Sequence, residues 1–466
     1  MRRLPVLCAF ILLCPTALAQ YYGPASEHPY SVERWDEDYS YLKDPGQRTD
    51  FFDPIKYIPL NADGDWYLSL GGQARYRFDY FNNTSFGAGV QDENGFHLTR
   101  LLAHLDAHFG PNLRAFVQLN SGMADNRAGG LRPGDADEFD VQQAFADLRL
   151  PLSESGDTSV TARLGRQELI YGSQRLVSPS DWNNVRRTFE GARLTFAFPN
   201  DTLDFFLTRP VVIEKEEPNT GDNHTSFAGV YNVTALPDLI RDADSRLELY
   251  FLALNKSPSA ITGFATTSDT YTLGSRFKTS PTPWDFDIEL DYQFGQTAGE
   301  SISAYSLATE LGYTFSNVPF TPRAYAGLDV ASGSHDPGRR FNQLFPPQYT
   351  YLGHIYLFGR QNIIDAHAGA SLALTSAVTL QLDQHVFWRQ NVNDAAYGIT
   401  GAVARPDNGS DAAYLGTEFD SVINWQITRH FSAYLGYAHF FTGTFISQTG
   451  PSHDIDFLYA AATFTF

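Results

Sequence analysis

The chain has 466 residues, a formal net charge of −20 and 43% hydrophobic residues, with 25 Tyr and 36 Phe. A chain this acidic is not a general nucleic-acid binder. Its two cysteines, Cys8 and Cys14, lie near the start, within a segment that we expect to be removed. Disulfides, thiolate metal sites and cysteine nucleophiles are therefore excluded from the remaining chain.

Residues 1–19 are typical of a cleaved signal peptide. Arg2 and Arg3 form a basic start, a short apolar run follows, and Ala17-Leu18-Ala19 is an A-x-A cleavage site. The apolar run is too short to cross a bilayer as a helix, and no later window has 18 consecutive apolar residues. Removal of the two arginines changes the net charge from −20 to −22.

Residues 20–65 are polar, aromatic and rich in Pro and Asp. We interpret them as an extended segment that stays in the periplasm or enters the lumen of the following domain. They are not expected to form a separate domain.

From residue 66 onward the sequence alternates with period two, in segments of about ten residues. In the first segment, one face carries Leu68, Leu70, Ala74, Tyr76, Phe78 and Tyr80, and the other carries Ser69, Gln73, Arg75, Arg77 and Asp79. A strand with one charged and one apolar face separates water from lipid. This pattern predicts an all-β fold, a transmembrane antiparallel β-barrel that spans residues 66–466.

The pattern predicts 18 strands, joined by alternating short and long connections. The expected strands are 66–80, 96–109, 113–124, 139–150, 159–168, 187–198, 202–212, 226–236, 246–255, 270–278, 284–296, 302–315, 323–331, 363–374, 378–390, 414–427, 431–443 and 455–466. An even number places both termini on the periplasmic side. The last strand ends in Phe464-Thr465-Phe466 and should pair with the first, which leaves no open edge in lipid.

The predicted register divides the lumen wall into a basic arc and an acidic arc. Inward positions on the first six strands include Arg75, Arg77, Arg100, Arg114, Arg149, Arg163, Arg187 and Arg193, with fewer acids (Asp79, Asp106 and Asp147). From the eleventh strand on, acids dominate: Asp285, Asp287, Glu289, Asp291, Glu310, Asp329, Asp383, Glu418 and Asp420, against Arg323 and Arg389.

Two interpretations of these charges remain open. A basic arc can attract and orient a charged solute, and arginines suit the carboxylates of a polyanionic sugar. Alternatively, each arginine is an ion-pair partner that braces the wall. A register error of one residue would exchange the two faces.

A catalytic reading has little support. His104, His108, His367 and His385 are expected to face the lumen, but none has the spacing of a Ser/His/Asp site or a metal site. His104, Asp106 and His108 are the best metal candidates, although a wetted polar strand face explains them more simply. We therefore predict no enzyme activity, no metal and no cofactor.

Several motifs in order along the chain resemble the alginate-export family of outer-membrane porins. They are Trp35-Asp36-Glu37-Asp38, Lys56-Tyr57-Ile58-Pro59-Leu60, Gly165-Arg166-Gln167-Glu168-Leu169, Tyr171-Gly172, Arg175-Leu176, Asn184 to Arg193, Arg209-Pro210-Val211, Phe341 to Pro346, Tyr351-Leu352-Gly353 and Leu357 to Asn362. Within them, Arg166, Arg186, Arg187, Arg193 and Arg360 match family positions. Glu190 and Ser180-Asp181-Trp182 depart from the family pattern near the pore, which leaves the precise substrate open.

The resemblance implies a monomeric 18-stranded barrel in the outer membrane of a Gram-negative bacterium, surrounded by its lipids. It also implies an arginine-lined pore that exports alginate or a similar polyuronate. Periplasmic secretion proteins would then be partners. The alternatives are an uptake porin for other small charged solutes, or a barrel enzyme or adhesin. In the long segment from Phe345-Pro346-Pro347 to Asn362, the stiff prolines indicate a loop that folds inward, with Arg360 near its base.

Overall fold

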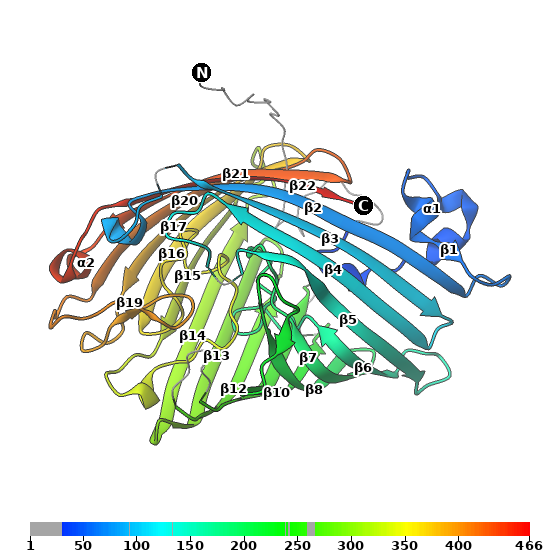
Figure 1. Cartoon of the computed structure of the whole chain (residues 1–466), viewed down its shortest axis with the longest axis horizontal. Coiled ribbons are helices and arrows are strands. Elements are labelled where there is room, and N and C mark those ends of the chain that lie inside the picture. Colours follow the sequence, from blue (N-terminus) through cyan, green and yellow to red (C-terminus); the bar gives the residue numbers. More distant parts are fainter. Residues whose placement is uncertain (1–29, 93, 133, 238, 241–242, 259–265) are drawn as a thin grey trace.

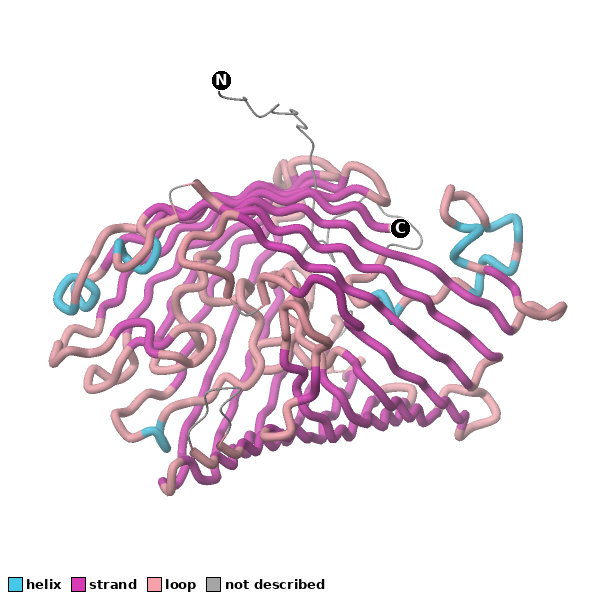
Figure 2. The backbone as a smooth tube through the Cα atoms, in the orientation of Figure 1, coloured by secondary structure: helices cyan, strands magenta, loops and turns pink. Residues whose placement is uncertain are grey.

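The computed structural model describes residues 30–466 except 93, 133, 238, 241–242 and 259–265. The predicted signal peptide lies outside these residues. The strands close into a barrel, with loop segments inside the ring of strands (Figures 1 and 2). The 18 strands of the wall are β2 (Trp66–Asn82), β3 (Phe96–Phe109), β4 (Leu113–Asp125), β5 (Asp137–Pro151), β6 (Ser159–Gln167), β7 (Phe189–Ala197), β8 (Asp201–Val212), β10 (Thr225–Ala235), β11 (Ser245–Lys256), β12 (Ser268–Thr279), β13 (Trp284–Thr297), β14 (Glu300–Thr314), β15 (Arg323–Ala331), β16 (Ile363–Ala373), β17 (Val378–Trp388), β20 (Tyr414–Gln426), β21 (Phe431–Thr442) and β22 (Ile455–Thr465).

Each wall strand pairs antiparallel with its neighbours, and β22 pairs with β2 from Gln73↔Thr465 to Asn82↔Asp456. The predicted barrel, its strand count and its closure are therefore confirmed. At most strand ends, the observed boundary differs from the predicted boundary by one or two residues. Closure leaves no unpaired edge along the wall.

The remaining elements are short segments of two to six residues. They are η1 (Arg34–Asp36), η2 (Ser40–Lys43), η3 (Pro45–Gln47), α1 (Asp53–Lys56), β1 (Ile58–Pro59), η4 (Thr84–Gly87), β9 (Thr220–Gly221), η5 (Pro337–Arg339), β18 (Ala396–Tyr397), β19 (Val403–Arg405) and α2 (Thr444–Thr449). Among the described residues, no helix is long and apolar enough to span a bilayer.

The outer surface of the wall is apolar in the way that alternation predicts. Many leucines on outward positions are exposed, and the most exposed include Leu164 (64%), Leu207 (63%) and Leu273 (59%). Exposed Trp66 and Trp284 stand at the strand ends that carry the short turns. An apolar belt with aromatic residues at its rim suits contact with lipid.

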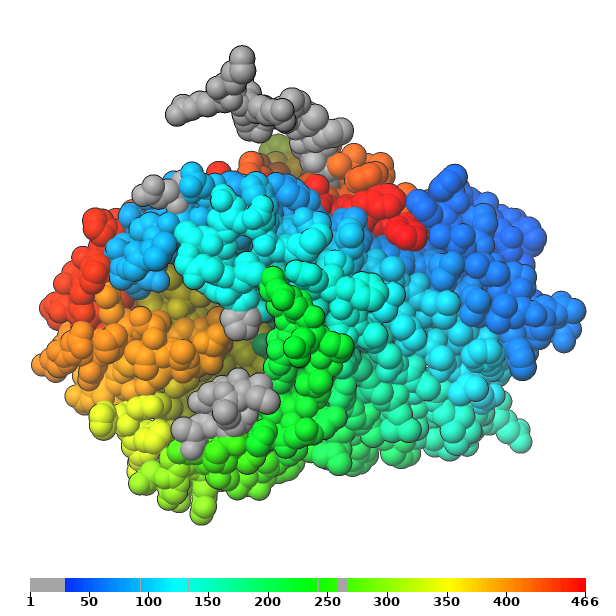
Figure 3. Space-filling view, viewed as in Figure 1, coloured from blue at the N-terminus to red at the C-terminus, as the bar shows by residue number. Residues whose placement is uncertain are grey.

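Short turns close one end of the barrel and longer loops the other. The two longest described loops at the second end are residues 332–362 and 389–413. In Figure 3 the surface at this end is hollowed between the 389–413 loop (orange) and the segment after β8 (green). The connection between β13 and β14 is the exception, since it has only two residues.

The N-terminal segment, residues 30–65, packs at the short-turn end beside the closing strands (Figure 1). Arg34 donates from Nη1 to the Gly72 carbonyl (3.0 Å) and from Nη2 to the Phe466 carbonyl (2.9 Å). The Trp35 carbonyl accepts a hydrogen bond from the inward-facing Arg114. This segment thus contacts both the barrel closure and the lumen wall.

Gly165 and Gly191 oppose each other on β6 and β7, where the chain leaves and re-enters the wall around an inward loop. Their φ angles are +133° and +154°. A Cβ atom would lie 2.1 Å from the Ala144 carbonyl oxygen at Gly165, and 2.2 Å from that of Leu207 at Gly191. Only glycine fits this conformation and this close approach.

Candidate functional site

The inner wall carries the charged side chains of the barrel. Arginines predominate on β2 to β7 and carboxylates on β13 to β20, on strand faces that alternate with lipid-facing residues. Two loops fold into the lumen between these arcs. We call residues 168–188, between β6 and β7, the first inward loop, and residues 332–362, between β15 and β16, the second inward loop.

Arg75, Arg77 and Arg100 hold the first inward loop against the basic arc. Arg75 donates to the carbonyl oxygens of Asp181 (2.8 Å) and Asn183 (2.9 Å). Arg100 donates to the Asp181 carbonyl (3.0 Å) and carboxylate (2.8 Å). Arg77 donates to the Trp182 carbonyl and pairs with Asp79. The three side chains are at most 5% exposed, so in this structure they anchor a loop.

Asp181 is the carboxylate at the centre of this anchor. Burial alone would raise its pKa. The positive charges of Arg100, Arg186 and Arg75 lower the pKa by more than burial raises it, so the pKa lies well below the usual range of an aspartate. The carboxylate therefore stays charged. Arg186 pairs with Asp181 and, at 2.7 Å, with Glu168, and so holds three residues of the same loop together.

Four other predicted pore arginines have carboxylate partners on or beside the wall. These pairs are Arg114–Asp106 (2.7 Å), Arg163–Asp147 (2.7 Å), Arg193–Asp204 (2.6 Å) and Arg360–Asp329. Arg149 lies at the short-turn end, is exposed, and donates to the Gly156 carbonyl (3.2 Å). The predicted arginines thus form a basic arc, but not a row of free guanidinium groups.

Arg187 differs from the prediction in its position. It was expected on a strand, but β7 begins at Phe189, and Arg187 belongs to the end of the first inward loop. Its Nη1 donates to the carbonyls of Ser178 (2.8 Å), Phe345 (2.8 Å) and Pro346 (3.1 Å). The described residues include no ion-pair partner for it, and burial lowers its pKa to about 10. It therefore remains a cation at neutral pH, where the two inward loops meet.

Arg175, which the motifs included but the sequence analysis did not assign to the pore, connects the first inward loop to the opposite wall. Its Nη1 lies 2.8 Å from Glu289 and 3.3 Å from Asp287 on β13. The loop is therefore attached to the basic arc near residue 181 and to the acidic arc at Arg175. A loop position cannot be assigned to a wall by strand alternation, which is why the sequence did not reveal this contact.

The predicted acidic residues also have ion-pair or hydrogen-bond partners. Asp287 pairs with Arg276 as well as Arg175, Glu289 accepts from Tyr250 (2.8 Å), and Glu310 pairs with Arg323. Asp383 accepts hydrogen bonds from Tyr325 and from Gln381 (2.8 Å). Glu418 accepts one from the Ile355 amide of the second inward loop (2.8 Å).

The two inward loops are joined to each other. Val177 and Phe345 form a parallel bridge, with Phe345 N donating to the Leu176 carbonyl (2.9 Å) and Ser178 N to the Phe345 carbonyl (2.9 Å). The rings of Trp182 and Tyr349 stack. The second loop therefore folds inward, as its prolines suggested, and together the loops narrow the lumen.

The second inward loop is also attached to the closing strands. The Tyr349 hydroxyl lies 2.6 Å from the Tyr459 hydroxyl on β22, and His354 Nδ1 lies 2.8 Å from the same Tyr459 oxygen. Burial, and then His385, lowers the pKa of His354 to about 3. His354 is therefore neutral at physiological pH and acts as a hydrogen-bonding group.

The histidines group differently from the sequence expectation. His104 stacks on Phe116, while His108 lies 3.0 Å from Asp106. The described residues contain one group of three side chains whose potential metal-ligand atoms all lie within 4.8 Å of one another. This group is Asp365, His367 and His385. His367 and His385 are directly opposed on β16 and β17.

A family model for alginate export matches residues 66–458. The chain belongs to the alginate export family. No curated protein sequence matches it. The resemblance of the motifs to this family is thereby confirmed for nearly the whole barrel.

Solved outer-membrane proteins of Pseudomonas aeruginosa share the fold of this family member. OccD3 (OpdP) superposes with a TM-score of 0.56 and 12% identity, over 86% of this chain and 91% of that one. OccK11 (OpdR) gives 0.53 and 11%, over 88% and 97%. OpdK with vanillate gives 0.54 and 12%, over 85% and 98%. Together with the closed barrel, the family places the protein in the outer membrane as a porin.

Proposed function

We propose that this porin passes an anionic polysaccharide of the polyuronate class, or its oligomers, outward through the gap controlled by the two inward loops. The observation that carries the proposal is Arg187, a cation held by carbonyl oxygens where the loops meet. A fixed charge at a constriction sets the selectivity of a pore more strongly than the charge of the whole protein does.

The arrangement of the wall supports the same function. Basic side chains on β2 to β7 face carboxylates on β13 to β20, which sets up a field across the lumen. Bracing by ion pairs does not require charges to be segregated in this way. A hydrated chain with a carboxylate on each sugar would be oriented by such a field, with its acidic groups toward β2 to β7.

We further propose that residues 1–19 are a signal peptide and that residues 20–65 act at the periplasmic mouth. The contacts of Arg34 and Trp35 with the barrel support the second point. Periplasmic secretion proteins could then meet the chain at this end, and the barrel would work as a monomer.

A second candidate is uptake of small charged solutes. Two observations favour it: the inward loops are joined by the Val177–Phe345 bridge, which suits a narrow passage, and OpdK, a similar barrel, has been crystallised with vanillate. In this case the same basic arc would bind a single carboxylate.

The test is conductance of the purified protein in a planar bilayer, with a salt gradient and with uronate monomers, oligomers and polymer added to either side. Polyuronate export predicts chloride preference and block by polymer added on the periplasmic side. Block by monomers alone would favour the uptake porin. Absence of both anion preference and block would contradict both functions.

A further inference from the structure

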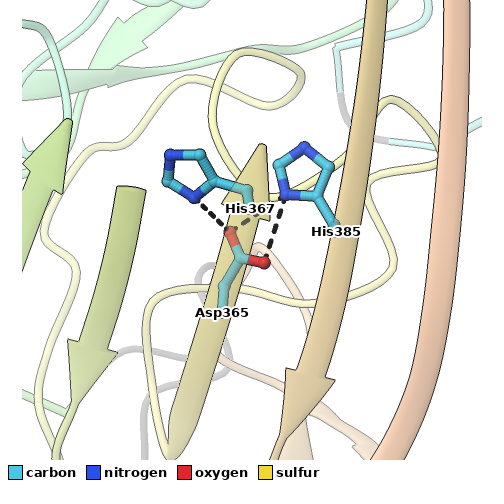
Figure 4. Close-up of side chains that lie close together, drawn as sticks. All are labelled: Asp365, His367 and His385. Atoms are coloured by element: carbon cyan, nitrogen blue, oxygen red, sulfur yellow. Dashed lines mark hydrogen bonds and ion pairs between the residues drawn. The ribbon is translucent and has the colours of Figure 1, made fainter. Parts of the chain in front are cut away.

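The cluster of Asp365, His367 and His385 has a ligand set that neither bracing nor solute passage uses. Figure 4 shows both imidazole rings directed at the Asp365 carboxylate, from β16 and β17. Nδ1 of His367 lies 3.1 Å, and Nδ1 of His385 3.0 Å, from Asp365 Oδ2. Asp365 is fully buried and His385 is 7% exposed, while the His367 side chain is 12% exposed.

The geometry points to a site for a divalent transition-metal ion of the zinc class, bound by His367 Nδ1, His385 Nδ1 and Asp365. Two imidazoles and a carboxylate form a common ligand set for such ions, with bonds of about 2.0–2.2 Å. Ligand atoms about 3.3 Å apart would surround a tetrahedral ion at this bond length. The two nitrogen–oxygen separations need to widen by only a few tenths of an ångström, and all the ligand atoms lie within 4.8 Å of one another. A fourth position is left for water.

A second observation supports a cation here. Glu418 and Asp420, on neighbouring inward positions of β20, are fully buried, and Glu418 Oε2 and Asp420 Oδ2 have no hydrogen-bond partner. Among the described residues, Asp365 and Asp420 form ion pairs only with histidines. Buried carboxylates without arginine or lysine are costly unless another positive charge is present.

Asp420 also suits the role of an outer partner. Its Oδ2 lies 3.9 Å from His385 Nε2, the ring nitrogen that would not hold the metal. A histidine that binds a metal through one nitrogen commonly donates through the other to a carboxylate, which fixes the ring. The ring is also stacked on Phe387, with planes 2° apart. His385 is thus oriented on two sides.

The consequence is a divalent cation on the acidic wall, next to the second inward loop. His354 N and Ile355 N of that loop donate to Asp420 Oδ1 (3.4 Å) and Glu418 Oε1 (2.8 Å). Metal binding would reduce the negative charge of this part of the wall. The inference does not depend on which solute the porin carries.

The test is calorimetric titration of ZnCl2 into the full-length barrel, stripped with EDTA and purified without a polyhistidine tag. We expect one ion per chain. His367→Gln and His385→Asn should each weaken binding at least 100-fold, and Asp420→Asn about 10-fold. The matched control is His224→Gln. His224 is exposed in the loop just before β10, and this variant should bind zinc as the unaltered protein does.

Folding of each variant is checked by heat-dependent migration in gels and by an unchanged β-sheet circular dichroism spectrum in metal-free buffer. His367 is the more exposed of the two histidines, so its replacement disturbs packing less. If His385→Asn fails to fold, the His367→Gln variant still tests the site. X-ray absorption of the zinc-loaded protein should show two nitrogen ligands and oxygen at about 2.0–2.2 Å. No stoichiometric binding, or equal binding by His367→Gln, would overturn the proposal.

Discussion

Trp182 and Tyr349 lie flat against each other, with ring centroids 3.8 Å apart and planes at 7°. One belongs to the first inward loop and the other to the second. Trp182 also lies under the Arg77 guanidinium, which is 4.0 Å from the ring centroid. A single ring therefore connects the basic arc to both loops, and through Tyr349 to Tyr459 on the closing strand.

Replacement of Trp182 by Ala should separate the loops without unfolding the barrel. The stacked pair and the cation–π contact each contribute on the order of 1 kcal/mol. We expect larger single-channel conductance and more frequent gating in planar bilayers. Trp284→Ala removes an exposed tryptophan at the short-turn rim and should leave conductance unchanged. Equal conductance in both variants would show that the stack does not restrict the lumen.

Arg187→Ala should reduce anion preference, because it removes a cation that no carboxylate of the described residues neutralises. The measurement is the reversal potential in a KCl gradient. Arg323→Ala is the control, since Arg323 also lies in the lumen but is paired with both Asp285 and Glu310. A smaller shift for Arg187→Ala than for Arg323→Ala would assign Arg187 to loop support alone.

Acid should loosen the second inward loop through His354. Its pKa is about 3 in the folded loop and about 6.5 when the loop is detached. The stabilisation is complete above pH 6.5 and is lost as pH falls toward 3, by about 1.4 kcal/mol for each pH unit. Hydrogen exchange of residues 349–358 should therefore accelerate between pH 7 and pH 4.5, after correction for the intrinsic rate.

His354→Gln keeps a hydrogen-bonding side chain that does not titrate, and it should remove most of this pH dependence. If the variant retained the full acceleration, the carboxylates of the neighbouring wall, and not His354, would be responsible.

Lys56→Met should strengthen docking of the N-terminal segment. Lys56 is 1% exposed, and its Nζ has no hydrogen-bond partner. Burial, followed by Arg34, lowers its pKa to about 7, so the cost of burying the charge is complete below pH 7 and disappears as pH rises toward 10.5. Chymotrypsin should thus cut residues 30–65 of the unaltered protein more slowly at pH 9 than at pH 7.

The Lys56→Met variant should resist chymotrypsin at pH 7 about as well as at pH 9. Lys43→Met, at an exposed position of the same segment, serves as the control for loss of a lysine. Faster cleavage of Lys56→Met would mean that the cation–π contacts of Lys56 with Tyr30 and Tyr39 outweigh its burial.

The wall could be predicted from the sequence because alternation along a strand is local. For instance, alternation alone assigns Leu164 to the lipid-facing side of its strand and Arg163 to the lumen-facing side. The loop contacts could not be predicted this way: Arg187 lies two residues outside its strand, and Arg175 reaches a wall more than a hundred residues away in sequence. Whether an arginine is free or paired also depends on such contacts.

The cluster of Asp365, His367 and His385 has a signal in the sequence that alternation within a single strand does not reveal. His367 and His385 are equally distant from the centre of the turn between the fourteenth and fifteenth predicted strands, so hairpin pairing alone sets them opposite each other. Asp365 precedes His367 by two residues and therefore shares its face. Applying the register across each predicted hairpin would have found the cluster.

The anchoring of the first inward loop by Arg75, Arg77 and Arg100 relies mainly on the main-chain oxygens of residues 181–183. Every amino acid carries such an oxygen. The main-chain part of the attachment can therefore persist while mutation replaces the side chains at these positions, and selection can alter what the channel admits without rebuilding the wall. Asp181 and Trp182, two of the departures from the family pattern, lie within residues 181–183.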